Sequence, residues 1–258
     1  MRWIVPVRGR GRRVARIVVG TVTAIVVGAA CPSPASAQVV LGILFGEKLA
    51  SENFNIGFEI GMNLSTVSDL SGAEVTRGTL LGLFGTWRFS EHYHLFTGVL
   101  ALSAKGAKDA DAIPLNDPVL DPTIAGRTME RNLGYIDIPV LLQWAQHRDG
   151  GVRIGAGPQV GILLSANDRY SAITPQGTAV VIENDIEESI ERFDAGVAFD
   201  AEYRITGLGL AIGLRYYQGL TDLLRGAGPS LHNQVLSGSG RITLGGRKPK
   251  PAAEPKGQ

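Results

Sequence analysis

The stretch FDAGVAFDAEYRITGLGLAIGLRYYQG, residues 193–219, decides the fold. Its first half alternates large or apolar residues with polar or small ones, so that Phe193, Val197 and Phe199 share one face and Asp194 and Asp200 the other. Its second half alternates in the same way, and only Ile-Thr-Gly (205–207) separates the two halves. A repeat of two residues is typical of β-strands, and the short link predicts an antiparallel hairpin.

Eight segments of this kind follow one another along the chain, and the links between them alternate between long and short. The predicted strands are Asn53–Leu64, Thr79–Phe89, Tyr93–Ala104, Gly134–Trp144, Val152–Ala166, Phe193–Arg204, Leu208–Gly219 and Gln234–Gly245. The short links are Ser90–His92, Ala145–Gly151 and Ile205–Gly207, and the long ones include Lys105–Leu133 and Asn167–Arg192. Such sorting of connections is typical of an outer-membrane barrel. The sequence therefore predicts an all-β protein, an eight-stranded antiparallel up-and-down transmembrane β-barrel.

The first 37 residues are predicted to be a cleaved secretory signal peptide. Six arginines and no acid precede the apolar run Ile17–Ala30, and Ala35-Ser36-Ala37 supplies small residues for cleavage. Two alternatives stay open, a twin-arginine signal at Arg12-Arg13 and lipidation of Cys31, the one cysteine of the chain. Removing residues 1–37 changes the net charge from +1 to −5, because the leader carries +6. An acidic chain without a basic stripe argues against nucleic-acid binding.

The rest of the chain divides into three predicted parts. Residues 38–52 form an N-terminal periplasmic segment, residues 53–246 the barrel, and residues 247–258 a Pro/Lys-rich tail that we expect to be disordered. The mature sequence contains no apolar run long enough for a transmembrane helix, whereas each apolar strand face is long enough for a tilted strand to cross the bilayer.

The inward faces of the predicted strands carry charges that should pair inside a narrow barrel. Across the seam between the first and last strands, Glu59 and Arg241 are expected at similar depth. Two prolines, Pro139 and Pro158, predict a local bulge, since proline cannot donate to a ladder; a functional weak seam is the alternative. The predicted interior cluster is Glu59, Arg88, Asp137, Arg153, Asp194, Asp200, Glu202, Arg204, Arg215 and Arg241.

Aromatic residues gather beside the short links, where the periplasmic girdle of a barrel belongs. The predicted girdle is Trp87, Phe89, Tyr93, Trp144 and Tyr203, unless these residues are scattered by chance.

The segments Gly-Tyr-Ile-Asp-Ile-Pro-Val-Leu-Leu-Gln-Trp (134–144) and Gly-Ala-Gly-Pro-Gln-Val-Gly-Ile-Leu-Leu (155–164) resemble the PorT-type outer-membrane β-barrel family. Residues 193–203 and 214–223 are similar to it as well. The resemblance implies an eight-stranded barrel in a Gram-negative outer membrane, and it carries over no catalytic residues. Some relatives take part in protein secretion.

The sequence leaves three classes of function open. We expect a structural or binding role through the long loops or the periplasmic rim, without enzymatic activity, cofactor or metal. A secretion or transport component that anchors partner proteins is the alternative, and a lipid-modifying enzyme built on His232, Ser230 and Ser237 is the third class. Expected partners are outer-membrane lipid, lipopolysaccharide and envelope proteins, and the barrel is expected to be a monomer. The acidic loop Asn167–Arg192 is expected to be a solvated surface, and divalent cations that bridge it to lipopolysaccharide phosphates are the alternative.

Overall fold

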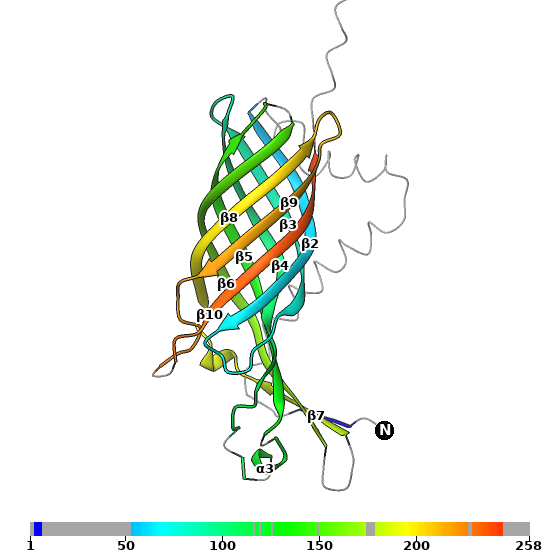
Figure 1. Cartoon of the computed structure of the whole chain (residues 1–258), viewed down its shortest axis with the longest axis vertical. Helices are drawn as coiled ribbons and strands as arrows, with labels where there is room; N and C mark the ends of the chain where they lie inside the picture. Colours follow the sequence, from blue (N-terminus) through cyan, green and yellow to red (C-terminus); the bar gives the residue numbers. More distant parts are fainter. Residues whose placement is uncertain are drawn as a thin grey trace, which may run out of the picture.

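In the computed structural model, eight strands form a closed antiparallel ring (Figure 1). The structure describes residues 3–6, 53–115, 117–118, 120–124, 126–148, 150–173, 179–226 and 229–244. The ring consists of β2 (Phe54–Ser68), β3 (Thr76–Arg88), β4 (Tyr93–Asp111), β5 (Thr128–Ala145), β6 (Gly151–Ile173), β8 (Phe193–Ile205), β9 (Leu210–Gly219) and β10 (His232–Leu244). Each strand pairs with the next one in the ring, and β10 pairs with β2 to close it. The predicted fold class is confirmed.

The three short turns lie at one end of the barrel, the upper end in Figure 1, and the long connections at the other. The long connections are nevertheless shorter than predicted. β4 continues to Asp111 and β5 begins at Thr128, so nearly half of the expected loop 105–133 is strand. β6 continues to Ile173 and pairs with an additional strand, β7 (Ala179–Asp185), within the expected loop 167–192. The sequence pattern does not predict these extensions, because a strand outside the membrane needs no apolar outer face and therefore shows no alternation of apolar and polar residues.

These extensions build a head beyond the long-loop end of the ring. It includes the short helix α3 (Asp121–Ile124), the 3-10 turn η1 (Glu187–Ser189) and the β6–β7 hairpin. In the full-length chain β7 also pairs in parallel with β1 (Trp3–Pro6), which lies within the predicted signal peptide. Cleavage of that peptide stays a prediction, and residues 38–52 and 247–258 lie outside the described residues.

A β-bulge explains why the alternation in β4 is hard to read. Leu100 pairs with Asp137 and Ser103 with Tyr135, so β4 contains one extra residue at this point. His94, Phe96 and Leu100 face inward before the bulge, whereas Ser103 and Lys105 face inward after it. An extra residue exchanges the two faces of a strand. A repeat of two residues therefore does not hold through β4.

The bulge predicted at Pro139 and Pro158 is wrong. Pro139 pairs with Gln159 and Leu142 with Ala156, which is the same register on both sides of the prolines. Within the described strands, Val140 and Leu141 have no ladder partner on β6. The barrel therefore accommodates the prolines by omitting ladder pairs, without inserting a residue.

The interior is layered along the barrel axis, and β5 displays the layers in order. Reading from the head, its inward residues are Met129, Arg131, Leu133, Tyr135, Asp137, Pro139, Leu141, Gln143 and Ala145. Three apolar clusters, which include Met129, Leu133 and Leu141 respectively, alternate with polar layers. Among the described residues, no helix has the length and hydropathy to span a bilayer.

Gly213 on β9 leaves room for a guanidinium in the interior. A Cβ atom at this position would lie 2.8 Å from Cζ of Arg241, closer than real Cβ contacts, whereas at Gly238 on the outer face of β10 the nearest atom is 3.8 Å away. We predict that Gly213→Ala lowers the free energy of unfolding by about 1–3 kcal/mol through overpacking. Gly238→Ala should change it by less than about 0.5 kcal/mol. Urea unfolding of both variants in detergent tests this, and equal stability of the two would contradict it.

Candidate functional site

The centre of the interior is Arg241, whose guanidinium contacts three carboxylates. Its Nη2 lies 3.1 Å from Glu59 Oε1 and 2.5 Å from Asp200 Oδ1, and its Nη1 lies 2.7 Å from Glu202 Oε2. All four side chains are at most 1% exposed. A buried guanidinium needs such partners, because leaving a charge unpaired in a dry interior costs several kcal/mol.

Strand register places these groups together. Arg241 and Glu59 are direct partners across the seam between β10 and β2, and Asp200 and Arg215 are partners between β8 and β9. The Glu59–Arg241 pair predicted from the sequence is therefore present. Arg215 joins the cluster at 3.2 Å from both Glu59 Oε2 and Asp200 Oδ1.

An apolar layer adjoins this cluster on the side of the head. Phe84 and Phe96 stack with their centroids 5.4 Å apart, in a cluster with Leu141, Tyr217 and Val235. The guanidinium carbons of Arg215 and Arg241 lie 5.1 and 4.7 Å from the centroid of Phe96. Cation–π contact thus supplements the ion pairs.

A second charged layer lies beyond the phenylalanines and depends on Lys105. Its Nζ lies 2.9 Å from Asp137 Oδ1 and 3.3 Å from Asp194 Oδ2, between the rings of Tyr135 and Tyr217. Tyr217 Oη and Asn233 Nδ2 also donate hydrogen bonds to Asp194. This layer separates the two apolar clusters that contain Leu141 and Leu133.

Sequence reasoning missed Lys105, because it was assigned to a loop and the bulge in β4 reverses its face. It also missed the buried pair Arg131–Asp168, whose guanidinium donates from Nε and Nη2 at 2.8 and 2.7 Å. Continued alternation of β5 past its predicted start could have found Arg131. Lys105 and Asp168 lie beyond register shifts, where the alternation changes face.

Nine of the ten residues of the predicted interior cluster are buried. Arg88 differs, because it lies at the short-turn rim, is half-buried and donates a hydrogen bond from Nη2 to Asn53 Oδ1 at 3.2 Å. The nine buried residues are Glu59, Asp137, Arg153, Asp194, Asp200, Glu202, Arg204, Arg215 and Arg241.

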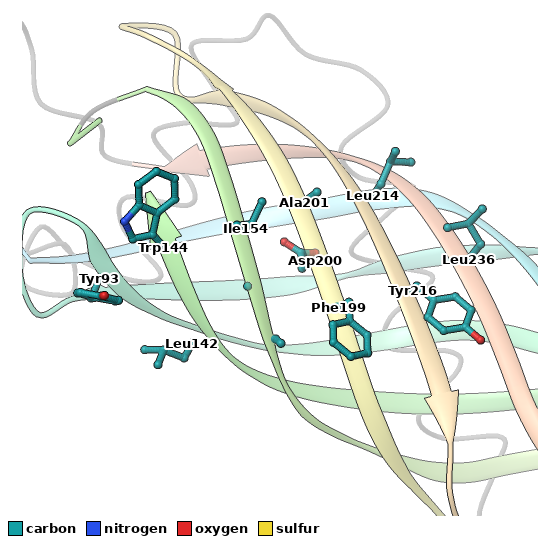
Figure 2. Close-up of a pocket in the computed structure, with 12 residues that line it drawn as sticks. Tyr93, Leu142, Trp144, Ile154, Phe199, Asp200, Ala201, Leu214, Tyr216 and Leu236 are labelled. Carbon is teal, nitrogen blue, oxygen red and sulfur yellow. The ribbon is translucent and has the colours of Figure 1, made fainter. Parts of the chain in front are cut away.

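The five predicted girdle residues are all on the outer surface, between 42% and 58% exposed, near the short turns. Close to them lies a shallow groove of about 660 Å³ on the outer face of β5, β6, β8 and β9 (Figure 2). Ala156 and Ala201 leave it open, and Trp144, Phe199 and Tyr216 are among the larger side chains around it. Apart from Asp200, which belongs to the interior cluster, its lining is apolar or aromatic.

The loop between β9 and β10 is organised by Asp222. Its Oδ1 accepts hydrogen bonds from the backbone N–H groups of Leu224 and Leu231, both at 3.1 Å, and its Oδ2 accepts one from Ser230 Oγ. These bonds position Leu223 and Leu231 in the apolar cluster at the barrel mouth, which also contains Val67, Leu133 and Ile190.

The same geometry bears on the histidine and serines considered as a lipid-modifying site. Ser230 Oγ is bonded to Asp222, and His232 Nδ1 lies 2.9 Å from the carbonyl oxygen of Thr221. A serine nucleophile of this kind requires that its hydroxyl be hydrogen-bonded to the histidine, and that the histidine be hydrogen-bonded to the acid. Here the serine is bonded to the acid instead. Among the described residues, no group of three or more His, Cys, Asp or Glu side chains could hold a metal ion.

The chain matches the model of the outer membrane protein beta-barrel domain over residues 44–225 and belongs to that family. It is an outer-membrane β-barrel protein. No curated protein matches it at a significant level.

Several solved barrels are similar to the chain at low sequence identity. Ail, the attachment invasion locus protein of Yersinia pestis, is 11% identical, with a TM-score of 0.39 over 75% of this chain and 99% of Ail. Neisserial surface protein A is 12% identical, with a TM-score of 0.37 over 73% of this chain and 96% of its own. OprG from Pseudomonas aeruginosa is 11% identical, with a TM-score of 0.37 over 74% and 95%.

The ion cluster predicts a strong and unequal coupling between Glu59 and Arg241. Each single change, Glu59→Gln or Arg241→Met, should destabilise the barrel by about 3–5 kcal/mol, with the larger loss for Arg241, which leaves three carboxylates behind. The double variant should lose less than the sum of the two. The exposed pair Arg169–Glu183 is the control, with a coupling below about 1 kcal/mol. Additive losses at Glu59 and Arg241 in urea unfolding would refute the coupling.

Asp222 predicts a local dependence on pH. The backbone N–H donors of Leu224 and Leu231 lower the pKa of its carboxyl below the ordinary value. A lowered pKa means that the stabilisation is present above the ordinary pKa and is lost as pH falls through the lowered one. Protection of the Leu224 and Leu231 amides from hydrogen exchange should therefore decrease at acidic pH. Asp222→Asn should show weakened protection already at pH 7, and identical profiles for both proteins would contradict this role.

Proposed function

We propose that the protein is a closed outer-membrane anchor that presents its head to binding partners, and that it is not an enzyme. The observation that carries this proposal is the construction of the head, which is an ordered extension of the barrel wall. The apolar cluster of Ala110, Ile124, Met129, Tyr170 and Ile182 packs within it. Tyr170 Oη also donates a hydrogen bond to the carbonyl oxygen of Ile113 at 3.1 Å.

A packed head suits recognition, because binding residues on a rigid scaffold lose little conformational entropy when a partner binds. The interior of the barrel is filled by alternating ionic and apolar layers. This supports a role as an anchor and argues against a conducting channel. The head also carries exposed ion pairs, among them Arg169–Glu183 and Arg225–Glu191, that offer charge to a polar partner such as lipopolysaccharide or an envelope protein.

The finer assignments belong to the same proposal. The segment 134–144 supports a PorT-type relative, and residues 1–37 support export with a cleaved signal peptide. A secretion-associated anchor is the second candidate, and the PorT-type resemblance favours it. Its partners would meet the short-turn rim, where the girdle residues Trp87, Tyr93 and Tyr203 lie.

Cysteine labelling tests the orientation. Ser171→Cys in the head should react with an impermeant maleimide on intact cells, because long connections of such barrels face outward. Thr206→Cys in a short turn should stay unlabelled until the outer membrane is permeabilised. Both positions are exposed, so accessibility of the side chain does not differ. The opposite pattern would show that the head faces the periplasm.

Site-specific crosslinking tests the role. A photo-crosslinking residue at Asp117 in the head should give a discrete product in growing cells, and the same residue at Thr206 should give none. A product only from Thr206 would favour the secretion-associated anchor. Absence of any product, or release of fatty acid from labelled lipid A by the purified protein, would contradict the proposal.

A further inference from the structure

The groove on the outer wall of the barrel has a floor of small residues and backbone (Figure 2). Gly155 on β6 pairs with Asp200 on β8, and this pair presents only backbone to the outside, because the Asp200 side chain points inward to Arg241. Ala156 and Ala201 follow these two residues on their strands and lie one step to either side of the pair. Each of them adds only a methyl group to the outer face.

Larger apolar side chains stand on both sides of each alanine. They are neighbours in the strand register, namely Leu142 and Phe199 beside Ala156, and Ile154 and Leu214 beside Ala201. The register therefore builds a hollow of about 660 Å³, which falls within the range of roughly 300–1,000 Å³ that is usual for sites of small molecules.

The groove lies in the part of the wall that faces lipid. Tyr93 and Trp144 of the aromatic girdle line it near the short turns, and the exposed Leu214 and Leu236 line it across β9 and β10. Of the described residues in its lining, Asp200 alone is charged, and its carboxylate is held in the interior cluster. The outer surface of the groove therefore suits hydrocarbon and offers no charge to a polar partner.

The groove also borders the interrupted ladder between β5 and β6. The ladder pairs Pro139 with Gln159 and resumes at Leu142 and Ala156, and Pro158 has no N–H group to donate. A hydrocarbon chain that lies over Leu142 and Ala156 contacts both strands at once. It therefore adds van der Waals packing across the two strands next to the place where ladder pairs are missing.

We infer that this groove binds one acyl chain of a phospholipid, which lies over Gly155, Ala156 and Ala201 between Trp144 and Tyr216. A chain in a groove is contacted from its sides as well as from below, so it gains more dispersion contacts than on a flat wall. The short turns of such barrels face the periplasm, so the lipid belongs to the periplasmic leaflet. This site goes beyond the proposed anchoring role, because it lies on the barrel wall and not on the head.

A phospholipid that carries a diazirine in its acyl chain tests the site by photo-crosslinking. The full-length protein is refolded into bilayers that contain this lipid and phosphatidylethanolamine, irradiated and digested, and the crosslinked residues are mapped by mass spectrometry. Crosslinks should concentrate on β6 and β8 around Ala156 and Ala201. An even distribution of crosslinks over the outer faces of all eight strands would overturn the inference.

Two variants fill the groove from outside, Ala156→Leu and Ala201→Leu. Each should abolish the concentration of crosslinks on β6 and β8, and each should lose the phospholipid that native mass spectrometry detects on the unmodified protein in maltoside detergent. Thr79→Leu, at an exposed outward position of β3, is the matched control and should behave as the native protein does. A heat-dependent shift in gel mobility shows that each variant is folded. Equal lipid retention by Ala201→Leu and Thr79→Leu would contradict the site.

The same wall of a second copy is the alternative occupant of the groove. A monomer that retains phospholipid in native mass spectrometry supports the acyl-chain site. A dimer that carries no lipid and dissociates in Ala201→Leu would overturn it. The anchoring proposal is unaffected by either result, because crosslinking at the head tests it independently.

Discussion

The constraint on which the rest of the structure depends is the contact of one guanidinium, Arg241, with three buried carboxylates. Eight tilted strands enclose only enough space for side chains, so charged groups inside must satisfy one another. Arg241 does this from the last strand toward β2 and β8, the strands of Glu59, Asp200 and Glu202. The closing seam is therefore held both by its backbone ladder and by an ion pair between register partners.

The layers between this ion cluster and the head divide the interior of the barrel into charged and apolar parts. Apolar clusters exclude water between the charged layers, which strengthens the ion pairs on either side by lowering the local dielectric. The cluster at the mouth combines residues of four strands with Ile190, Leu223 and Leu231 from the loops. The loop residues therefore pack in the same apolar cluster as the barrel residues, and this cluster connects the barrel to the head.

Much of the fold could be predicted from the sequence, because a wall that faces lipid outside and charge inside must alternate. That requirement places Glu59, Asp200 and Arg215 inward without further information. The requirement fails where the wall leaves the apolar belt, and for that reason the sequence pattern predicts loops where β4, β5 and β6 continue as strands. It also fails at the bulge in β4, where one additional residue concealed Lys105.

Other features could not be predicted from the pattern, because they depend on details of packing. Pro139 and Pro158 predict a bulge, yet the register is unchanged, because β5 and β6 omit the ladder pairs beside the prolines without inserting a residue. The role of Asp222 in the loop could not be predicted from the sequence, because it depends on backbone N–H donors that come together only in the folded loop.

Single-channel recording in planar lipid bilayers tests the central claim, a barrel closed by its own ionic and apolar layers, most directly. The account predicts a silent bilayer after insertion of the folded protein, with steps appearing when the layers are removed together by Arg241→Ala, Phe96→Ala and Leu133→Ala. Stable conductance steps from the native protein would contradict it.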